Sequence, residues 1–255
     1  MIDVSRYTTI MSKILREGQV GNFILEKKVM PKGMEVQMYD SKEGRIYWDV
    51  LSEDFPVVVL IEKTEDGKTV WMSDAPLEQE SILPAVPLAR GDVLICGLGI
   101  GLLPTLIKNK KSVKHIDIVE INKEVIELVF EQIKTPKMSV IHADAWKYLA
   151  ETENKYDFVH VDIWGSITAP IKEIARAIEL ASRCLKPNGK IRCWMQELYD
   201  RIKDNLPKKP VHSSGVGVYP PCLICGKIIR NDYAGLCMDC ADALGLSELF
   251  IKEVE

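Results

Sequence analysis

The sequence predicts an α/β fold: a mostly parallel sheet with helices on both faces, preceded by a small antiparallel β region and followed by a small cysteine-rich module. Three observations carry this prediction. After Gly91, apolar strand-like runs alternate with segments of helical periodicity, which is typical of parallel sheets with right-handed crossovers. Between Met34 and Asp74, short β-rich runs are separated by turn sequences. Four cysteines then fall within nineteen residues, at positions 222–240.

Length and composition set the outer limits of the prediction. A chain of 255 residues, 47% of them hydrophobic, can form one large domain and a small appendage. The net charge of -4 gives no net basic field, which argues against nucleic acid as a partner. No run of about 18 apolar residues is present, and the N-terminus is too polar for a secretory signal. We therefore expect a soluble cytoplasmic protein with no membrane partner.

The N-terminal region, residues 1–75, is expected to combine a helix with β structure. Apolar residues between Val4 and Arg16 have helical spacing. Residues 34–74 predict short strands in one small antiparallel sheet. A connecting segment follows, in which Pro76, Pro84 and Pro87 limit any helix to one or two turns.

Residues 76–206 are expected to form the α/β domain. Strands are predicted at residues 92–96, 114–119, 139–143, 156–162 and 190–195, with helices at 102–109, 122–133, 144–151 and 168–185. Ligands of such sheets bind at the carboxyl ends of the strands. The residues that follow each strand are therefore the candidates for a binding site.

A glycine-rich turn, GLGIG, follows the first strand of this domain. Its glycines are Gly97, Gly99 and Gly101, and the third glycine of a dinucleotide fingerprint would stand at Leu102. This spacing counts against NAD. Glycines here allow backbone N–H groups to meet a ligand closely, although a tight turn with no ligand would look the same.

Acidic residues end the next strands. Glu120 lies 21 residues after Gly99, the spacing at which a carboxylate can accept hydrogen bonds from a ribose diol. Asp144, followed by Ala145, closes the third strand in a position suited to an adenine amino group. Helix capping is the alternative explanation for both carboxylates.

The fourth strand ends in YDFVHVDIWG. Asp162 would stand where a reacting atom sits, and Trp164 follows it. Trp164 can equally be a core residue. His160, inside the same strand, is interpreted as a core histidine with satisfied hydrogen bonds.

The cysteines near the C-terminus have the spacing of a metal site. Two CxxC pairs, separated by eleven residues, can surround one tetrahedral Zn²⁺, and this pattern favours a structural metal over two disulfides in a chain without a secretory signal. We expect a linker at 207–221 and a zinc module at 222–255. The module is acidic, so docking on the main domain or on a second subunit, as in a homodimer, is its expected role. The predicted ligands are Cys222, Cys225, Cys237 and Cys240.

From Trp71 to Glu197 the chain resembles class I S-adenosylmethionine-dependent methyltransferases, and more narrowly their spermidine synthase-like branch. The resemblance lies in VLICGLGIG, VEIN, HADA and YDFVHVDIW. It implies a Rossmann-like domain in which Gly97, Gly99 and Gly101 line the methionine and ribose part of S-adenosylmethionine. In that domain Glu120 holds the ribose, and Asp144 with Ala145 faces adenine.

The chain also departs from these families. Spermidine synthases carry an aspartate in the loop GGGDGG for the ammonium of their donor, and this chain has Ile100 there; many methyltransferases have an acidic residue at the position of Ile95. Asp162, Glu78 and Glu80 are the candidates to replace that carboxylate.

Because the loop aspartate is absent, the sequence favours an enzyme that transfers a methyl group from S-adenosylmethionine to an unidentified acceptor. The acceptor would attack the methyl carbon in line with the sulfonium. Asp162 would accept a proton, and Trp164 would stack on a flat acceptor. Two alternatives stay open: an aminopropyltransferase of the spermidine synthase type, and a non-catalytic nucleoside-binding or interaction platform with a structural zinc module.

Overall fold

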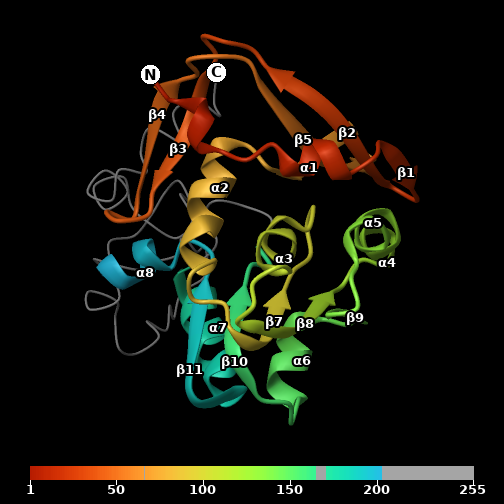
Figure 1. The fold of residues 1–255 in the computed structure, drawn as a ribbon, viewed down its shortest axis with the longest axis vertical. Coiled ribbons are helices and arrows are strands. Elements are labelled where there is room, and N and C mark those ends of the chain that lie inside the picture. Colours follow the sequence, from red (N-terminus) through yellow and green to blue (C-terminus); the bar gives the residue numbers. More distant parts are fainter. Residues whose placement is uncertain (66, 165–170, 203–255) are drawn as a thin grey trace, which may run out of the picture.

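The computed structural model of the chain describes residues 1–65, 67–164 and 171–202. A five-stranded sheet of order β11-β10-β7-β8-β9 forms the lower half of the molecule in Figure 1. All four neighbouring pairs in it are parallel, so the predicted α/β fold with a parallel sheet is confirmed. Its strands are β7 (Gly91–Cys96), β8 (Val113–Glu120), β9 (Met138–His142), β10 (Tyr156–Val161) and β11 (Leu185–Cys193).

Helices cover both faces of this sheet. On β7, Val93 and Ile95 pack into one apolar cluster, while Leu94 and Cys96 pack into another on the opposite face. The first cluster includes residues of α3 (Leu102–Ile107) and of the helical segment α4 (Lys123–Val125), η3 (Ile126–Phe130) and α5 (Glu131–Ile133). The second includes residues of α6 (Ala145–Glu151) and α7 (Ile171–Arg183). Burial on both faces explains why β7 is an uninterrupted apolar run.

The carboxyl ends of the central strands meet at one edge. The register pairs Cys96 of β7 with Val161 of β10 on one side and with Val119 of β8 on the other. The residues that follow these three strands therefore lie side by side, as the predicted site requires.

The N-terminal region forms two sheets instead of the single one expected. A four-stranded antiparallel sheet has the order β1-β2-β5-β6, and β3 and β4 form a separate hairpin. The strand Phe23–Met30, which the sequence analysis missed, pairs with β5 along its whole length. Its three consecutive charged residues hide the alternation that marks a strand. The strands are β1 (Gly18–Val20), β2 (Phe23–Met30), β3 (Glu35–Asp40), β4 (Arg45–Val50), β5 (Phe55–Thr64) and β6 (Gly67–Ser73).

The expected helix from Val4 to Arg16 is interrupted. Its pieces are η1 (Val4–Arg6) and α1 (Ile10–Ile14). Between them Tyr7 is extended, with φ -104° and ψ 147°, and its hydroxyl donates to Glu80 at 2.7 Å. That tertiary contact overrides the helical periodicity of the segment.

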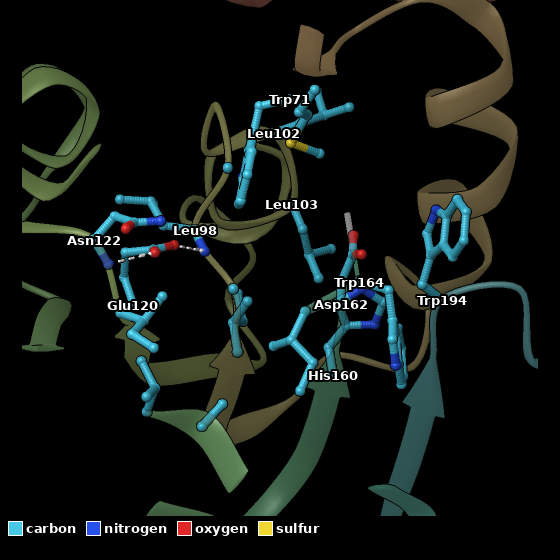
Figure 2. A pocket seen from close by; sticks show the side chains of 18 of the residues that line it. Trp71, Leu98, Leu102, Leu103, Glu120, Asn122, His160, Asp162, Trp164 and Trp194 are labelled. Carbon is cyan, nitrogen blue, oxygen red and sulfur yellow. Dashed lines mark hydrogen bonds between the residues drawn. The ribbon is translucent and has the colours of Figure 1, made fainter. Parts of the chain in front are cut away.

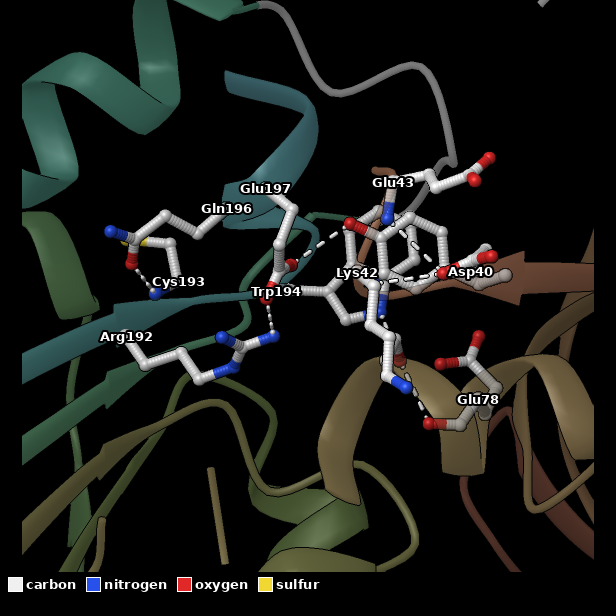
Figure 3. A network of polar contacts seen from close by, with 11 residues as sticks. Asp40, Lys42, Glu43, Glu78, Arg192, Cys193, Trp194, Gln196 and Glu197 are labelled. Atoms are coloured by element: carbon white, nitrogen blue, oxygen red, sulfur yellow. Dashed lines mark hydrogen bonds and ion pairs between the residues drawn. The ribbon is translucent and has the colours of Figure 1, made fainter. Parts of the chain in front are cut away.

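Polar contacts tie the N-terminal region to the parallel sheet (Figure 3). The connecting segment contains α2 (Pro76–Ile82) and η2 (Leu83–Ala85), and Trp194 Nε1, just after β11, donates to Ser81 Oγ of α2 at 2.9 Å. Glu197, in α8 (Gln196–Ile202), forms an ion pair with Arg192 at 2.5 Å and accepts from Tyr39 Oη at 2.9 Å. Helix α2 is thus held over the edge of the sheet. In the described part of the chain, no helix is long and apolar enough to cross a membrane.

Candidate active site

A cavity of about 430 Å³ lies at the carboxyl edge of the parallel sheet. Residues of the sheet edge, the glycine loop, β6 and α2 line it together. Figure 2 shows Glu120 beside Leu98 in one part of this space and Asp162, His160, Trp164 and Trp194 in another. The cavity therefore brings together most of the residues that the sequence singled out.

The glycine loop forms the wall next to β7. Gly97, Gly99 and Gly101 all have positive φ, at 95°, 50° and 75°. A Cβ at Gly97 would lie 1.8 Å from the carbonyl oxygen of Asp162, so glycine is required for the two segments to meet. Gly97 and Gly99 line the cavity, whereas Gly101 packs against Ile133 behind it.

Most N–H groups of this loop already have partners inside the protein. Gly97 N donates to Val119 O, Gly101 N to Leu98 O, and Leu98 N to Glu120. Ile100 N points to the sulfur of Met72, at 3.4 Å. The N–H groups of these four residues therefore have partners within the protein, and contact of the loop backbone with a ligand stays a prediction. The glycines instead allow the loop backbone to lie directly against the Asp162 main chain and the cavity.

Glu120, the last residue of β8, is 7% exposed and lines the cavity. Its two carboxylate oxygens accept from Leu98 N and Asn122 N, each at 2.9 Å. A carboxylate oxygen has a second lone pair, so both can still accept from a ligand's hydroxyl groups. Glu120 fixes the loop conformation, a role the sequence did not reveal.

Asp144 and Ala145 also line the cavity. Asp144 is the N-cap of α6, and its Oδ1 accepts from Lys147 N at 3.1 Å. Asp144 therefore both caps α6 and lines the cavity.

Asp162 and Glu78 both line the cavity. Burial and the nearby Glu78 carboxylate raise the pKa of Asp162 well above its ordinary value. Burial raises the pKa of Glu78 to about 7, although hydrogen bonding from Trp194 and Ser81 opposes this shift. Two carboxyl groups with raised pKa values facing one cavity are typical of a site for cations or proton transfer.

His160 lies two residues before Asp162 and is 1% exposed. Burial and the positive charge of Arg192 lower its pKa to about 3, so the imidazole is neutral. Neither ring nitrogen has a hydrogen-bond partner among the described residues. His160 is buried in the core as expected, but none of the described residues forms a hydrogen bond that satisfies either ring nitrogen.

Aromatic side chains supply the remaining walls. Trp164, predicted to contact a ligand, lines the cavity together with Trp71, Trp146 and Trp194, which the sequence analysis did not single out. Trp164 packs edge to face on Trp146, with ring centroids 6.5 Å apart. A signal was available for Trp194, which directly follows the strand β11 at the carboxyl edge, whereas Trp71 lies within β6 of the N-terminal sheet.

Charge in the cavity has one sign. Among the described residues that line it, four are acidic, Glu78, Glu120, Asp144 and Asp162, and none is lysine or arginine. The nearby cation Arg192 forms its ion pair with Glu197 instead. The cavity therefore favours a ligand that carries positive charge and no carboxylate of its own.

The predicted zinc ligands, Cys222, Cys225, Cys237 and Cys240, lie outside the described residues, as do the linker and module around them. Within the described ranges, no group of three or more His, Cys, Asp or Glu side chains is arranged to hold a metal. The other three cysteines, Cys96, Cys184 and Cys193, are free and buried, as expected.

Together, the strands and the cavity define a Rossmann-like domain with a cavity at the carboxyl edge of its parallel sheet. Comparison with known families narrows this class. The model of the spermine/spermidine synthase domain matches residues 76–201, just under half of the chain. The chain thus contains a spermidine synthase-like domain.

Curated relatives agree with that match. A polyamine aminopropyltransferase of Alkaliphilus metalliredigens is 26% identical over 127 residues, which are 43% of this chain and 45% of the relative. Another from Clostridium perfringens is 31% identical over 141 residues, 51% of this chain and 48% of the relative. One from Methanocaldococcus jannaschii is 37% identical over 78 residues, 28% of this chain and 27% of the relative. The matches thus span less than half the length of these relatives.

Solved structures with a similar arrangement include spermidine synthase from Thermotoga maritima, at 14% identity and a TM-score of 0.37, covering 66% of each chain. The N-methyltransferase NodS from Bradyrhizobium japonicum aligns at 17% identity and a TM-score of 0.39, over 47% of this chain and 68% of NodS.

These comparisons correct two expectations. The sequence analysis favoured a methyltransferase that uses S-adenosylmethionine as methyl donor, but the family match and the three relatives are all of the polyamine aminopropyltransferase type. The absence of the loop aspartate does not by itself distinguish a methyltransferase from an aminopropyltransferase. The carboxylates of the cavity come from other elements, which only the folded chain reveals.

Proposed function

We propose that the protein transfers an aminopropyl group from decarboxylated S-adenosylmethionine to an amine acceptor. The observation that carries this proposal is the acidic character of the cavity, which has four Asp or Glu side chains and no Lys or Arg among the described lining residues. The decarboxylated donor has a sulfonium, an ammonium and no carboxylate. S-adenosylmethionine itself would place its carboxylate among four others, beside a loop whose N–H groups are largely taken.

The cavity also has places for the nucleoside part of this donor. The free lone pairs of Glu120 suit the ribose hydroxyls, and Asp144 with Ala145 suits the adenine. Gly97 and Gly99 line the part of the cavity where the chain that joins the sugar to the sulfur would lie. In this placement the sulfur and its aminopropyl group extend toward Asp162.

The reaction is a substitution at carbon. The amine nitrogen of the acceptor attacks the aminopropyl carbon bonded to sulfur, from the side opposite the sulfur and from about 3 to 3.5 Å. The new C–N bond forms as the C–S bond breaks, and the sulfur keeps the electron pair as the neutral thioether of 5′-methylthioadenosine. The attacking nitrogen gives up a proton, which Asp162 accepts. The raised pKa of Asp162 makes its carboxylate a stronger base than an ordinary aspartate.

A turnover assay tests the proposal. The protein is incubated with decarboxylated S-adenosylmethionine and a panel of linear amines, and 5′-methylthioadenosine is measured by mass spectrometry. We expect product with the wild-type protein and about a 100-fold or greater loss of turnover for Asp162→Asn. Asp157→Asn, at the opposite end of β10, is the matched control and should keep turnover. Absence of 5′-methylthioadenosine with every amine, or full turnover by Asp162→Asn, would contradict the proposal.

A further inference from the structure

The donor proposed above carries an ammonium group at the end of its aminopropyl chain, and this group needs a carboxylate. The glycine loop supplies none. Ile100 occupies the position of the family's loop aspartate, but its side chain is fully buried in the apolar core and does not line the cavity. Ile95, at the position of the methyltransferase carboxylate, contributes an apolar wall. The partner of the ammonium must therefore come from another element.

Helix α2 offers two glutamates, and the structure separates them. Glu80 points to the N-terminal segment, where it accepts from Tyr7 Oη at 2.7 Å and forms an ion pair with Arg6 at 3.4 Å. Glu78 lies two residues earlier and lines the cavity together with Asp162. Only Glu78 is placed to meet a ligand.

Among the described residues that line the cavity, no lysine or arginine faces this carboxylate pair. Arg192 pairs with Glu197 at 2.5 Å. His160, which lines the same cavity, is 1% exposed and neutral, and its two ring nitrogens have no partner in the described part of the chain. A cavity that holds two facing acids and an unpartnered imidazole, with no basic side chain in its described lining, is built for a polar, cationic ligand.

We infer that Glu78 binds the terminal ammonium of the donor's aminopropyl group, while Asp162 remains available to take the proton of the acceptor amine. This inference rests on the proposed function. In this assignment, helix α2 selects the donor. A donor with an ammonium and no carboxylate binds, whereas Glu78 and Asp162 repel the carboxylate of S-adenosylmethionine.

Comparing two nucleosides tests the assignment. Decarboxylated S-adenosylmethionine carries the ammonium, and 5′-methylthioadenosine lacks the whole aminopropyl chain. Their dissociation constants are measured by calorimetry for the wild-type protein, Glu78→Gln and the matched control Glu80→Gln. We expect Glu78→Gln to weaken donor binding by about 10- to 100-fold and to leave 5′-methylthioadenosine binding within about twofold. Glu80→Gln should change neither.

The outcomes separate the two proposals. Unchanged donor binding by Glu78→Gln, with wild-type affinity for 5′-methylthioadenosine, would overturn the role of Glu78 and leave the proposed function standing. An equal loss for both nucleosides would also overturn it, because the effect would not depend on the ammonium. If the wild-type protein binds neither nucleoside, the proposed function itself fails.

Discussion

Replacing Gly97 with alanine should disturb the site through a single contact. The backbone at Gly97 has φ 95°, and an added Cβ would lie 1.8 Å from the carbonyl oxygen of Asp162. Because real contacts of this kind are not shorter than 3.0 Å, the loop or the Asp162 main chain must move by more than 1 Å. The unfavourable φ costs about 1 to 2 kcal/mol, and forced repacking adds about 1 to 3 kcal/mol.

Gly33 provides the matched control. Its φ is 83°, but an added Cβ would meet nothing within 4 Å, so Gly33→Ala should cost only the backbone term of about 1 to 2 kcal/mol. Thermal unfolding measured by circular dichroism should place the melting temperature of Gly97→Ala roughly 2 to 12 °C below that of Gly33→Ala, from about 1 to 3 kcal/mol at about 2 to 4 °C per kcal/mol. Turnover should fall only in Gly97→Ala, because Asp162 is displaced. Equal melting temperatures and equal turnover in the two variants would refute the close approach of Gly97 to Asp162.

Two further predictions concern the carboxylates. Glu120→Gln leaves one main-chain N–H facing an amide NH₂ group instead of an oxygen, so we expect a loss of about 1.5 to 3 kcal/mol in unfolding free energy and weaker binding of 5′-methylthioadenosine. Denaturant unfolding measures the first effect and calorimetry the second. An unchanged unfolding free energy would argue against the hydrogen bonds between Glu120 and the main chain. Donor binding should also depend on pH, because the pKa of Glu78 is raised to about 7. Below that pH the carboxyl is protonated and cannot pair with an ammonium, so donor affinity should rise from pH 6 to pH 8, while affinity for 5′-methylthioadenosine stays level. A donor affinity that falls over this range would contradict the sign of the effect. The groups facing Glu78 are Asp162, Trp194 and Ser81.

The parallel sheet could be predicted from the sequence because its signals are local. The central strands β7 and β10 are short and largely apolar, and segments with helical periodicity alternate with the strands. The residues that end β8 and β10, Glu120 and Asp162, were found for the same reason, since the carboxyl edge follows from the alternation alone. By contrast, the pairing of Phe23–Met30 with β5 joins distant segments and interrupts its own alternation with charged residues.

The contents of the cavity could be predicted only in part. Whether Glu78 or Glu80 faces the site depends on how α2 is rotated against the sheet, which the contacts of Tyr7 and Trp194 determine. The hydrogen bonds that the loop N–H groups form within the protein could not be predicted from the sequence either. The choice between methyl and aminopropyl transfer depends on the balance of charge in the assembled cavity, and the missing aspartate at Ile100 pointed the other way.

Calorimetric titration of the wild-type protein with the two donors tests the central claim most directly. We predict that decarboxylated S-adenosylmethionine binds at least about tenfold more tightly than S-adenosylmethionine, because both donors carry an ammonium but only S-adenosylmethionine brings a carboxylate into the acidic cavity. Equal or tighter binding of S-adenosylmethionine would show that the acidic cavity does not select its donor by charge, and would contradict the account.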